Sequence, residues 1–154
     1  MGASRVSQHI GAWVVSVSGL IAVVSILLPW GKFDRSGSTL TLNGFQIDGY
    51  DDAGLSGGAL LLGGCLIAAI GLVMLARRSK GRLVRVAAVA LSFVMSALAA
   101  FSLYCVHQWA VDGRKFNHAA GAAHTEVGPY VLLVACIAAL VATALRLLAA
   151  KRAL

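Results

Sequence analysis

The sequence predicts an all-α membrane protein in which four transmembrane helices form a bundle. Hydrophobic residues other than glycine make up 59% of the chain, whereas a water-soluble domain reaches about 45–50% with glycine included. Four apolar stretches each approach the roughly 20 residues that a helix needs to cross the hydrocarbon layer of a bilayer. Basic residues gather on one side of these stretches, as they do when charge sets orientation in a membrane. The spans fill most of the 154 residues, so we expect a single domain, 1–154.

The first predicted span covers residues 10–28. Pro29 marks its end, because the residue before a proline is disfavoured in the α conformation. Trp30 follows directly, and we expect it at the membrane interface, where tryptophan is enriched. A secretory signal has a shorter apolar core and a cleavage site of small residues. The sequence Leu28-Pro29-Trp30 offers no such site, so an uncleaved span is expected.

Three further apolar stretches predict three more spans, at residues 57–76, 84–106 and 128–145. Pro129 suits the first turn of the last span, because that position does not use the N–H that proline lacks. The connections are two outer loops and one short basic inner loop, at residues 29–56, 107–127 and 77–83.

Charge predicts which side of the membrane each loop faces. Nine basic residues and no acidic residue lie in or beside the inner loop and the chain ends: Arg5, Arg77, Arg78, Lys80, Arg82, Arg85, Arg146, Lys151 and Arg152. The outer loops hold all six acidic residues. Because basic residues resist transfer across the membrane, we expect both termini in the cytoplasm and the chain in the plasma membrane, the inner membrane of a bacterium. The charge thus predicts membrane lipids, not nucleic acid, as neighbours.

The first outer loop contains a β-hairpin signal. Thr39-Leu40-Thr41-Leu42 and Phe45-Gln46-Ile47 alternate in polarity on the two sides of Asn43-Gly44. A two-stranded hairpin is marginally stable by itself in water. We therefore expect it to lie on the helix ends, on the second outer loop or on a partner.

The outer loops also contain side chains of the types that bind metals. Asp48, Asp51 and Asp52 suggest a cation loop, but their spacing does not match the alternating ligands of an EF-hand. Three histidines in the second outer loop suggest zinc, but they lack the H-x-x-x-H spacing of a helical zinc site. We predict no metal and no other cofactor. The three cysteines lie within or at the end of apolar stretches, which predicts no disulfide.

Inside the predicted spans, small residues recur at helical spacing. They are Ala88, Ser92, Ser96 and Ala100 in the third span and Gly64, Ala68 and Gly71 in the second. Such stripes let two helix backbones approach closely, within this chain or against a partner helix. No ionisable side chain other than cysteine lies deep in a span, and coupled transporters and intramembrane enzymes usually keep such residues. An enzyme is therefore not expected.

An offset of 71 residues matches part of the second span to the fourth, including Cys65 with Cys136. The match indicates either a parallel repeat of two helical hairpins or a coincidence of a restricted composition.

Three short sequences carry a resemblance to known proteins. They are Leu28-Pro29-Trp30, the segment from Gly44-Phe45 to Asp48-Gly49-Tyr50-Asp51-Asp52-Ala53-Gly54, and Val127-Gly128-Pro129-Tyr130. With its four spans, the chain resembles a broad group of small uncharacterised membrane proteins of actinobacterial type. The architecture is also similar to that of claudins, although the paired loop cysteines of claudins are missing here. Neither resemblance implies an activity or assigns a residue a role.

The leading functional expectation is a non-enzymatic accessory or scaffolding subunit that binds another envelope protein or itself. The alternative is a small oligomeric pore, a holin-like or an immunity-type protein, with serines such as Ser16, Ser18 and Ser25 or Ser92, Ser96 and Ser102 turned toward a lumen. A third possibility is lipid binding by the basic cluster. The candidate interaction residues are Leu40, Leu42, Phe45, Ile47, Tyr50, Asp51, Asp52, His107, His118 and His124.

Overall fold

The computed structural model describes residues 3–35, 38–46, 57–76, 82–116 and 123–151. These residues form four long helices and a small sheet of three strands. In chain order the elements are α1 (Ala3–Ser25), β1 (Pro29–Arg35), β2 (Ser38–Asn43), α2 (Gly57–Ala76), α3 (Arg82–Phe116), β3 (Ala123–Thr125) and α4 (Val127–Lys151). The prediction of a largely helical chain is confirmed.

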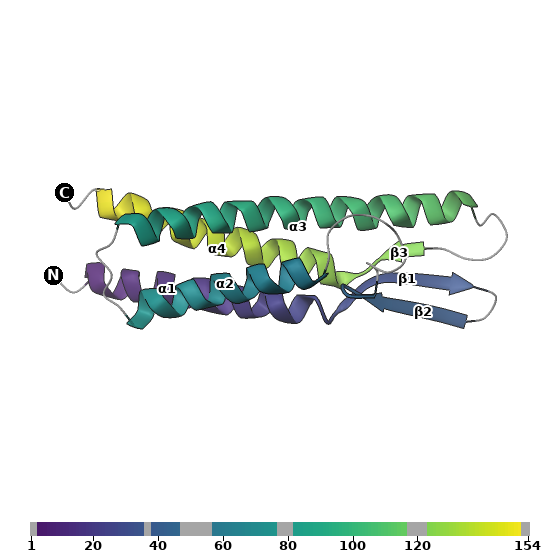
Figure 1. The fold of residues 1–154 in the computed structure, drawn as a ribbon, viewed down its shortest axis with the longest axis horizontal. Helices are drawn as coiled ribbons and strands as arrows, with labels where there is room; N and C mark the ends of the chain where they lie inside the picture. The colour runs from purple at the N-terminus through teal and green to yellow at the C-terminus, as the bar shows by residue number, and fades with distance from the viewer. Residues whose placement is uncertain (1–2, 36–37, 47–56, 77–81, 117–122, 152–154) are drawn as a thin grey trace.

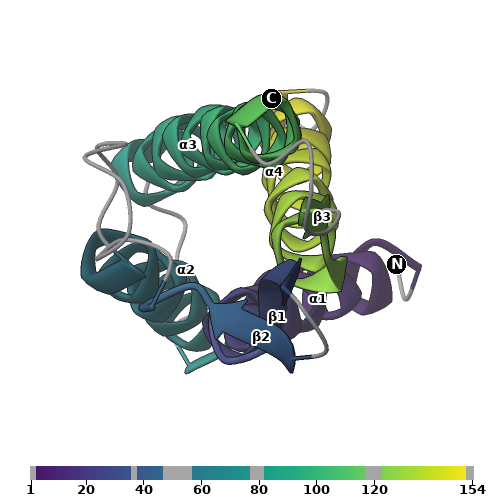
Figure 2. The ribbon, with the colours of Figure 1, turned by 90° about the vertical axis from the view of Figure 1, so that its right-hand side faces the viewer.

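The four helices run side by side along the long axis of the molecule (Figure 1). α1 begins and α4 ends at the same end of the molecule, which we call the terminal end; the sheet lies at the opposite end, the sheet end. Viewed from the sheet end, α1 lies between α2 and α4, and α3 lies beside α4 (Figure 2). All three of these neighbouring helix pairs are in contact.

Two of the helices are long and apolar enough to cross a membrane. These stretches are Leu83–Gln108 within α3 and Val127–Ala149 within α4. α1 and α2 contain shorter apolar stretches, His9–Ser25 and Gly58–Met74.

Several helix ends differ from the ends of the predicted spans: α1 begins at Ala3 and not at 10, and α4 ends at Lys151 and not at 145. α3 continues to Phe116, ten residues beyond the predicted end at 106. The added turns include polar residues, and α3 is in contact with β3. α1 ends at Ser25, three residues before the predicted end at 28. The amides of residues 26–28 instead donate to carbonyls three residues earlier, at 3.0–3.3 Å, which tightens the chain into a turn before β1. An apolar run marks burial, and it does not mark where the helical backbone stops.

The sheet joins the two predicted outer loops. Its strand order is β2-β1-β3 with both pairs antiparallel, and Lys32 of β1 lies opposite Thr41 of β2 and His124 of β3. β2 therefore confirms the strand predicted around Thr39–Leu42, and β3 supplies support from the second outer loop.

The predicted hairpin partner was wrong. β2 pairs with the preceding strand β1, while Gly44 to Gln46 form a turn; Ile47 lies outside the described residues. The cause is Asn43, whose Oδ1 accepts hydrogen bonds from the amides of Phe45 (3.1 Å) and Gln46 (3.0 Å). The Gln46 side chain accepts a bond from the Asn43 amide in return. An asparagine that bonds the backbone in this way favours a turn over an extended strand.

Helices α1 and α2 approach closely through small residues. A Cβ atom placed on Gly19 would lie 2.7 Å from the Cα atom of Ala68, and one on Gly71 would lie 2.8 Å from the Cα atom of Ser16. Gly64 contacts α1 in the same way, at Val23. The stripe predicted in the second span therefore packs within this chain.

The stripe predicted in the third span is only partly buried. Ala88 and Ser92 are buried, but Ala100 is exposed, and the buried face continues through Met95 and Ala99. The prediction was wrong at Ala100 because steps of four residues drift about 40° around a helix that has 3.6 residues per turn. Alternating steps of three and four stay on one face.

Candidate functional site

Trp30 attaches the sheet to the helices. It follows Pro29 at the start of β1, and only 2% of its surface is exposed. Its indole Nε1 donates a hydrogen bond of 2.8 Å to the carbonyl oxygen of Ser25, where α1 ends. The ring folds back onto the helix end and is enclosed by protein, and its expected place at the membrane interface stays a prediction.

Two glycines make the space that the Trp30 ring occupies. A Cβ atom on Gly44 would lie 2.9 Å from Cε2 of the ring, and one on Gly128 would overlap the ring at Cδ1. Backbone bonds lock both segments in place: the Gly44 amide donates to the Ile26 carbonyl at 2.9 Å, and the Glu126 amide donates to the Trp30 carbonyl at 3.0 Å. Residues from both outer loops and two helices thus meet at one indole. Sequence reasoning did not identify this junction.

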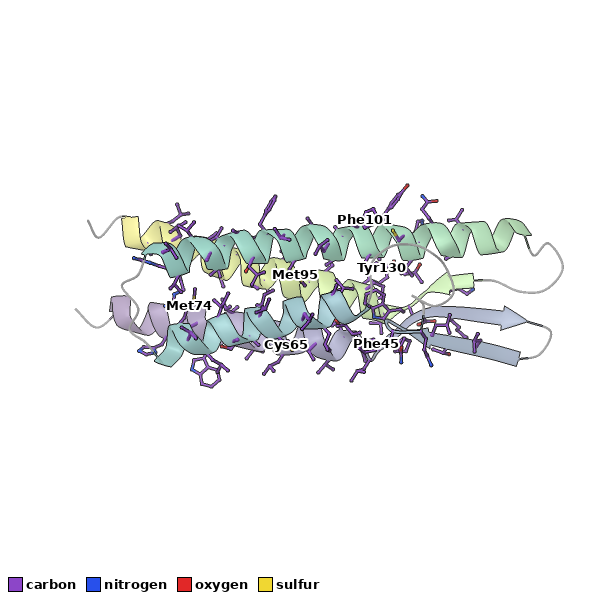
Figure 3. All side chains as sticks on the ribbon, viewed as in Figure 1. Phe45, Cys65, Met74, Met95, Phe101 and Tyr130 are labelled. Atoms are coloured by element: carbon purple, nitrogen blue, oxygen red, sulfur yellow. The ribbon has the colours of Figure 1, made fainter. Side chains whose placement is uncertain are left out.

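Two of the predicted interaction residues are exposed apolar side chains at the sheet end. Leu40 on β2 is 44% exposed and Phe45 in the following turn is 43% exposed. Figure 3 shows Phe45 near the junction of the helices with the sheet. We call Leu40 and Phe45 the outer patch. β2 lies at one edge of the sheet in the described strand order, so the patch sits at the border of the sheet.

Leu42 does not belong to the outer patch. It lies on the same face of β2 as Leu40, because side chains alternate along a strand, yet it is only 4% exposed. It pairs with Gly31, next to Trp30, so it packs near the helix ends while Leu40 lies further out along the strand. The prediction that Leu42 is available to a partner was wrong. Four other candidates, Ile47, Tyr50, Asp51 and Asp52, lie outside the described residues.

The histidines do not converge in the part of the chain that the structure describes. His107 is exposed on α3 and His124 is exposed on β3, while His118 lies outside the described residues. No group of three histidine, cysteine, aspartate or glutamate side chains that could hold a metal ion occurs among the residues searched, which are the described ones. Cys65 is exposed, Cys105 is half-buried and Cys136 is buried, each as a free thiol.

The serines considered for a lumen are mostly buried and bonded to their own helices. Ser16 donates to the Ala12 carbonyl at 3.1 Å, Ser25 to the Ala22 carbonyl at 2.7 Å and Ser102 to the Leu98 carbonyl at 2.9 Å. A hydroxyl that bonds the preceding turn satisfies its own donor and can be packed among apolar groups. Hydroxyl groups in this arrangement serve helix packing.

Comparisons of the chain with protein-family models, with curated proteins and with solved structures find no match.

Proposed function

We propose that this chain is a non-enzymatic membrane protein of four spans that binds another protein of the cell envelope through the outer patch. The observation that carries the proposal is that two large apolar side chains, Leu40 on β2 and Phe45 in the turn after it, are exposed at the end of the molecule where Trp30 fixes the sheet to the helices. A surface held in place loses little conformational entropy when a partner binds. Exposed apolar side chains on such a surface are typical of protein interfaces.

The helix surfaces support a membrane location for all four helices. Each helix exposes large apolar side chains: Trp13, Leu20 and Val24 on α1, Leu62, Leu66 and Leu72 on α2, Leu83, Phe93 and Phe101 on α3, and Val134, Leu145 and Leu148 on α4. Water-soluble monomers rarely expose apolar surface so extensively. The apolar stretches His9–Ser25 of α1 and Gly58–Met74 of α2 each extend about 26 Å at about 1.5 Å per residue. This length lies near the lower limit for a helix that crosses a hydrocarbon layer of about 30 Å.

The distribution of charge supports the orientation. α1 begins, α2 ends, α3 begins and α4 ends at the terminal end (Figure 1), and the sequence in and beside these helix ends holds nine basic residues and no acidic residue. By the preference for positive charge on the cytoplasmic side, the terminal end faces the cytoplasm and the sheet end faces outward. The outer patch would then meet proteins outside the cytoplasmic membrane.

The contacts give less support to an oligomeric pore. A water-filled lumen needs polar groups that face the water. The hydroxyls of Ser16, Ser25 and Ser102 are instead buried within one chain and bond to their own helix backbones.

Site-specific photocrosslinking in native membranes tests the proposal. A photoreactive amino acid is placed at Leu40 or Phe45, with Thr41 and Leu66 as matched controls. Thr41 is exposed on the opposite face of β2, and Leu66 is exposed on α2. We expect Leu40 and Phe45 to give one adduct with the same larger protein, identified by mass spectrometry, and the controls not to give it.

Two results would overturn the proposal. One is the absence of any specific adduct at Leu40 and Phe45, and the other is an adduct at twice the mass of the chain, which identifies a second copy as the partner. As a second measurement, the pair of substitutions Leu40→Ser and Phe45→Ser should reduce copurification of the partner by about tenfold or more, as loss of two apolar contacts at an interface does. Thr41→Ser should leave it unchanged.

A further inference from the structure

Helix α3 is longer than a bilayer is thick. Its 35 residues, Arg82–Phe116, extend about 52 Å at about 1.5 Å per residue, whereas the hydrocarbon layer is about 30 Å thick. Enclosing the whole helix in hydrocarbon would require a tilt of about 55°, and transmembrane helices tilt by about 0–40°. Part of α3 therefore lies outside the hydrocarbon layer if the helix crosses a membrane.

The part outside is the end of α3 that lies beside the sheet. The sequence of its last turns includes Asp112, Arg114 and Lys115, and charged residues are costly in hydrocarbon. These turns run alongside the strands (Figure 1), and α3 is in contact with β3. The membrane boundary must then lie at a position on α3 before these charged residues.

Two exposed tyrosines lie at a similar level on adjacent helices. Tyr104 on α3 is 59% exposed, and Tyr130 in the first turn of α4 is 48% exposed. Figure 3 shows Tyr130 and Phe101, which precedes Tyr104 by one turn, at similar positions along the long axis. Tyrosine has an apolar ring and a polar hydroxyl group, and it is enriched where hydrocarbon meets water.

The spacing on both helices fits one bilayer. The rise from Arg82, where α3 begins, to Tyr104 is about 33 Å, and the rise from Tyr130 to Lys151, where α4 ends, is about 32 Å. Both distances are close to the hydrocarbon thickness of about 30 Å. Among the described residues between these limits, every exposed one is apolar, and the first exposed residue of α3 after Tyr104 is His107.

We propose that Tyr104 and Tyr130 contact the lipid headgroup layer at the sheet end of the helices. The hydrocarbon then ends at their level, and α3 continues beyond it for about 18 Å beside the sheet. Through its contact with β3, this part of α3 holds the sheet outside the bilayer. The inference rests on the membrane location in the proposed function, and it is independent of the outer patch and of the orientation of the chain.

Spin labels on the full-length chain in phosphatidylcholine vesicles measure the depth of α3 and α4. Each label is attached to one introduced cysteine, in a chain whose three native cysteines are replaced by alanine. Collisions with oxygen report hydrocarbon, and collisions with a water-soluble nickel complex report water. Phe93→Cys and Val141→Cys should give equal and greatest depth, because each exposed position lies halfway between a tyrosine and the opposite helix end. The label at His107→Cys should be readily reached by the nickel complex.

A double variant tests whether the tyrosines determine the boundary. Tyr104→Leu with Tyr130→Leu keeps two large apolar side chains but removes both hydroxyl groups and with them the preference for the interface. We expect hydrocarbon to extend further along α3, so that access of the nickel complex to the label at His107→Cys falls by about twofold or more. Phe101→Leu with Val134→Leu is the matched control at exposed positions within the hydrocarbon, and it should leave this access unchanged.

The inference is overturned if the label at His107→Cys is as inaccessible to the nickel complex as the label at Phe93→Cys. It is also overturned if the labels at Phe93→Cys and Val141→Cys differ in depth by more than about 5 Å, one helical turn, or if the tyrosine double variant changes nothing. If that variant does not fold, the depths of the single-cysteine variants still decide where the boundary lies. Failure of the chain to fractionate with membranes would instead refute the proposed function.

Discussion

Trp30 and Ser25 are joined by a hydrogen bond from the indole Nε1 to the backbone carbonyl, at 2.8 Å. The Leu28 amide donates to the same carbonyl at 3.2 Å, so the indole is a second donor to a buried acceptor at the end of α1, where helices leave carbonyls without an i+4 partner. Because β1 begins beside Trp30, this contact helps to fix the direction in which the chain leaves the helix. It acts together with the backbone bonds from Gly44 to Ile26 and from Glu126 to Trp30.

Replacing Trp30 with phenylalanine tests this bond. Trp30→Phe keeps an aromatic ring but removes this bond and leaves the Ser25 carbonyl with the Leu28 amide, at 3.2 Å, as a donor, so we expect a loss of about 0.5–1.5 kcal/mol in the free energy of unfolding. The measurement is thermal unfolding of the purified protein in mild detergent, followed by circular dichroism. Trp13→Phe is the matched control, because Trp13 is exposed on α1, the helix whose end Trp30 contacts. Equal Tm values for the two variants would contradict the role assigned to Trp30.

Gly128 should be intolerant of any side chain. Gly128→Ala places a methyl group against the Trp30 ring and 2.8 Å from the Pro29 carbonyl oxygen. We expect destabilisation of about 1–3 kcal/mol from overpacking, read as a lowered Tm. The adjacent substitution Val127→Ala, at an exposed position, is the control.

A double variant identifies the ring as the cause. In a Trp30→Leu background the ring is gone, so Gly128→Ala should cost less than it does in the wild type, which is the non-additivity expected for residues in contact. An unchanged cost would show that the ring is not what the methyl group meets.

The close contact of α1 and α2 predicts a second sensitive glycine. Gly19→Ala brings a methyl group against the backbone of Ala68, and backbone cannot move aside as a flexible side chain can. We expect a loss of about 1–3 kcal/mol and a lower yield of folded protein, measured by fluorescence-detected size-exclusion chromatography. Ala97→Val, which adds bulk at an exposed position of α3, should have little effect. Equal yields for both variants would indicate that the helices separate readily.

Substitutions at Leu40 and Leu42 should distinguish an effect on partner binding from an effect on the stability of the fold. Leu42→Ser removes a buried apolar side chain and should cost about 2–5 kcal/mol, whereas Leu40→Ser should change stability by less than about 0.5 kcal/mol, as exposed substitutions do. Thermal unfolding of both variants measures the difference. A large loss of stability in Leu40→Ser would mean that Leu40 is packed, and any loss of partner binding in that variant would then be indirect.

The helices were predictable where their ends coincide with a change of composition. The second span was predicted at 57–76, and α2 has the same bounds, because glycines precede the apolar run and arginines follow it. The end of α3 was not predictable in this way. Its last turns are polar, and their helical state is accompanied by contact with β3, a segment further along the chain.

The junction at Trp30 could not be predicted from local sequence patterns either, because it also depends on contacts between segments that are separated along the chain. Trp30, Gly44 and Gly128 come from three distant parts of the chain, and each has an ordinary local interpretation as an interfacial, turn or helix-start residue. The same limit applies to the match between the second and fourth predicted spans at an offset of 71 residues. Cys65 is exposed, whereas its counterpart Cys136 is fully buried. Similar local sequence does not produce a similar environment when the neighbouring helices differ.

The orientation of the chain in the membrane is tested by cysteine accessibility. In a variant whose three native cysteines are replaced by alanine, a single cysteine is introduced at Ser38, where β2 begins, or at Ser79, in the basic inner connection. Because positive charge favours the cytoplasmic side, a membrane-impermeant maleimide added to intact cells should label Ser38→Cys and not Ser79→Cys. Lysis of the cells should then make Ser79→Cys reactive, which serves as the control for its accessibility. Labelling of Ser79→Cys from outside, with Ser38→Cys protected, would place the outer patch in the cytoplasm, and the proposed function would lose its membrane geometry.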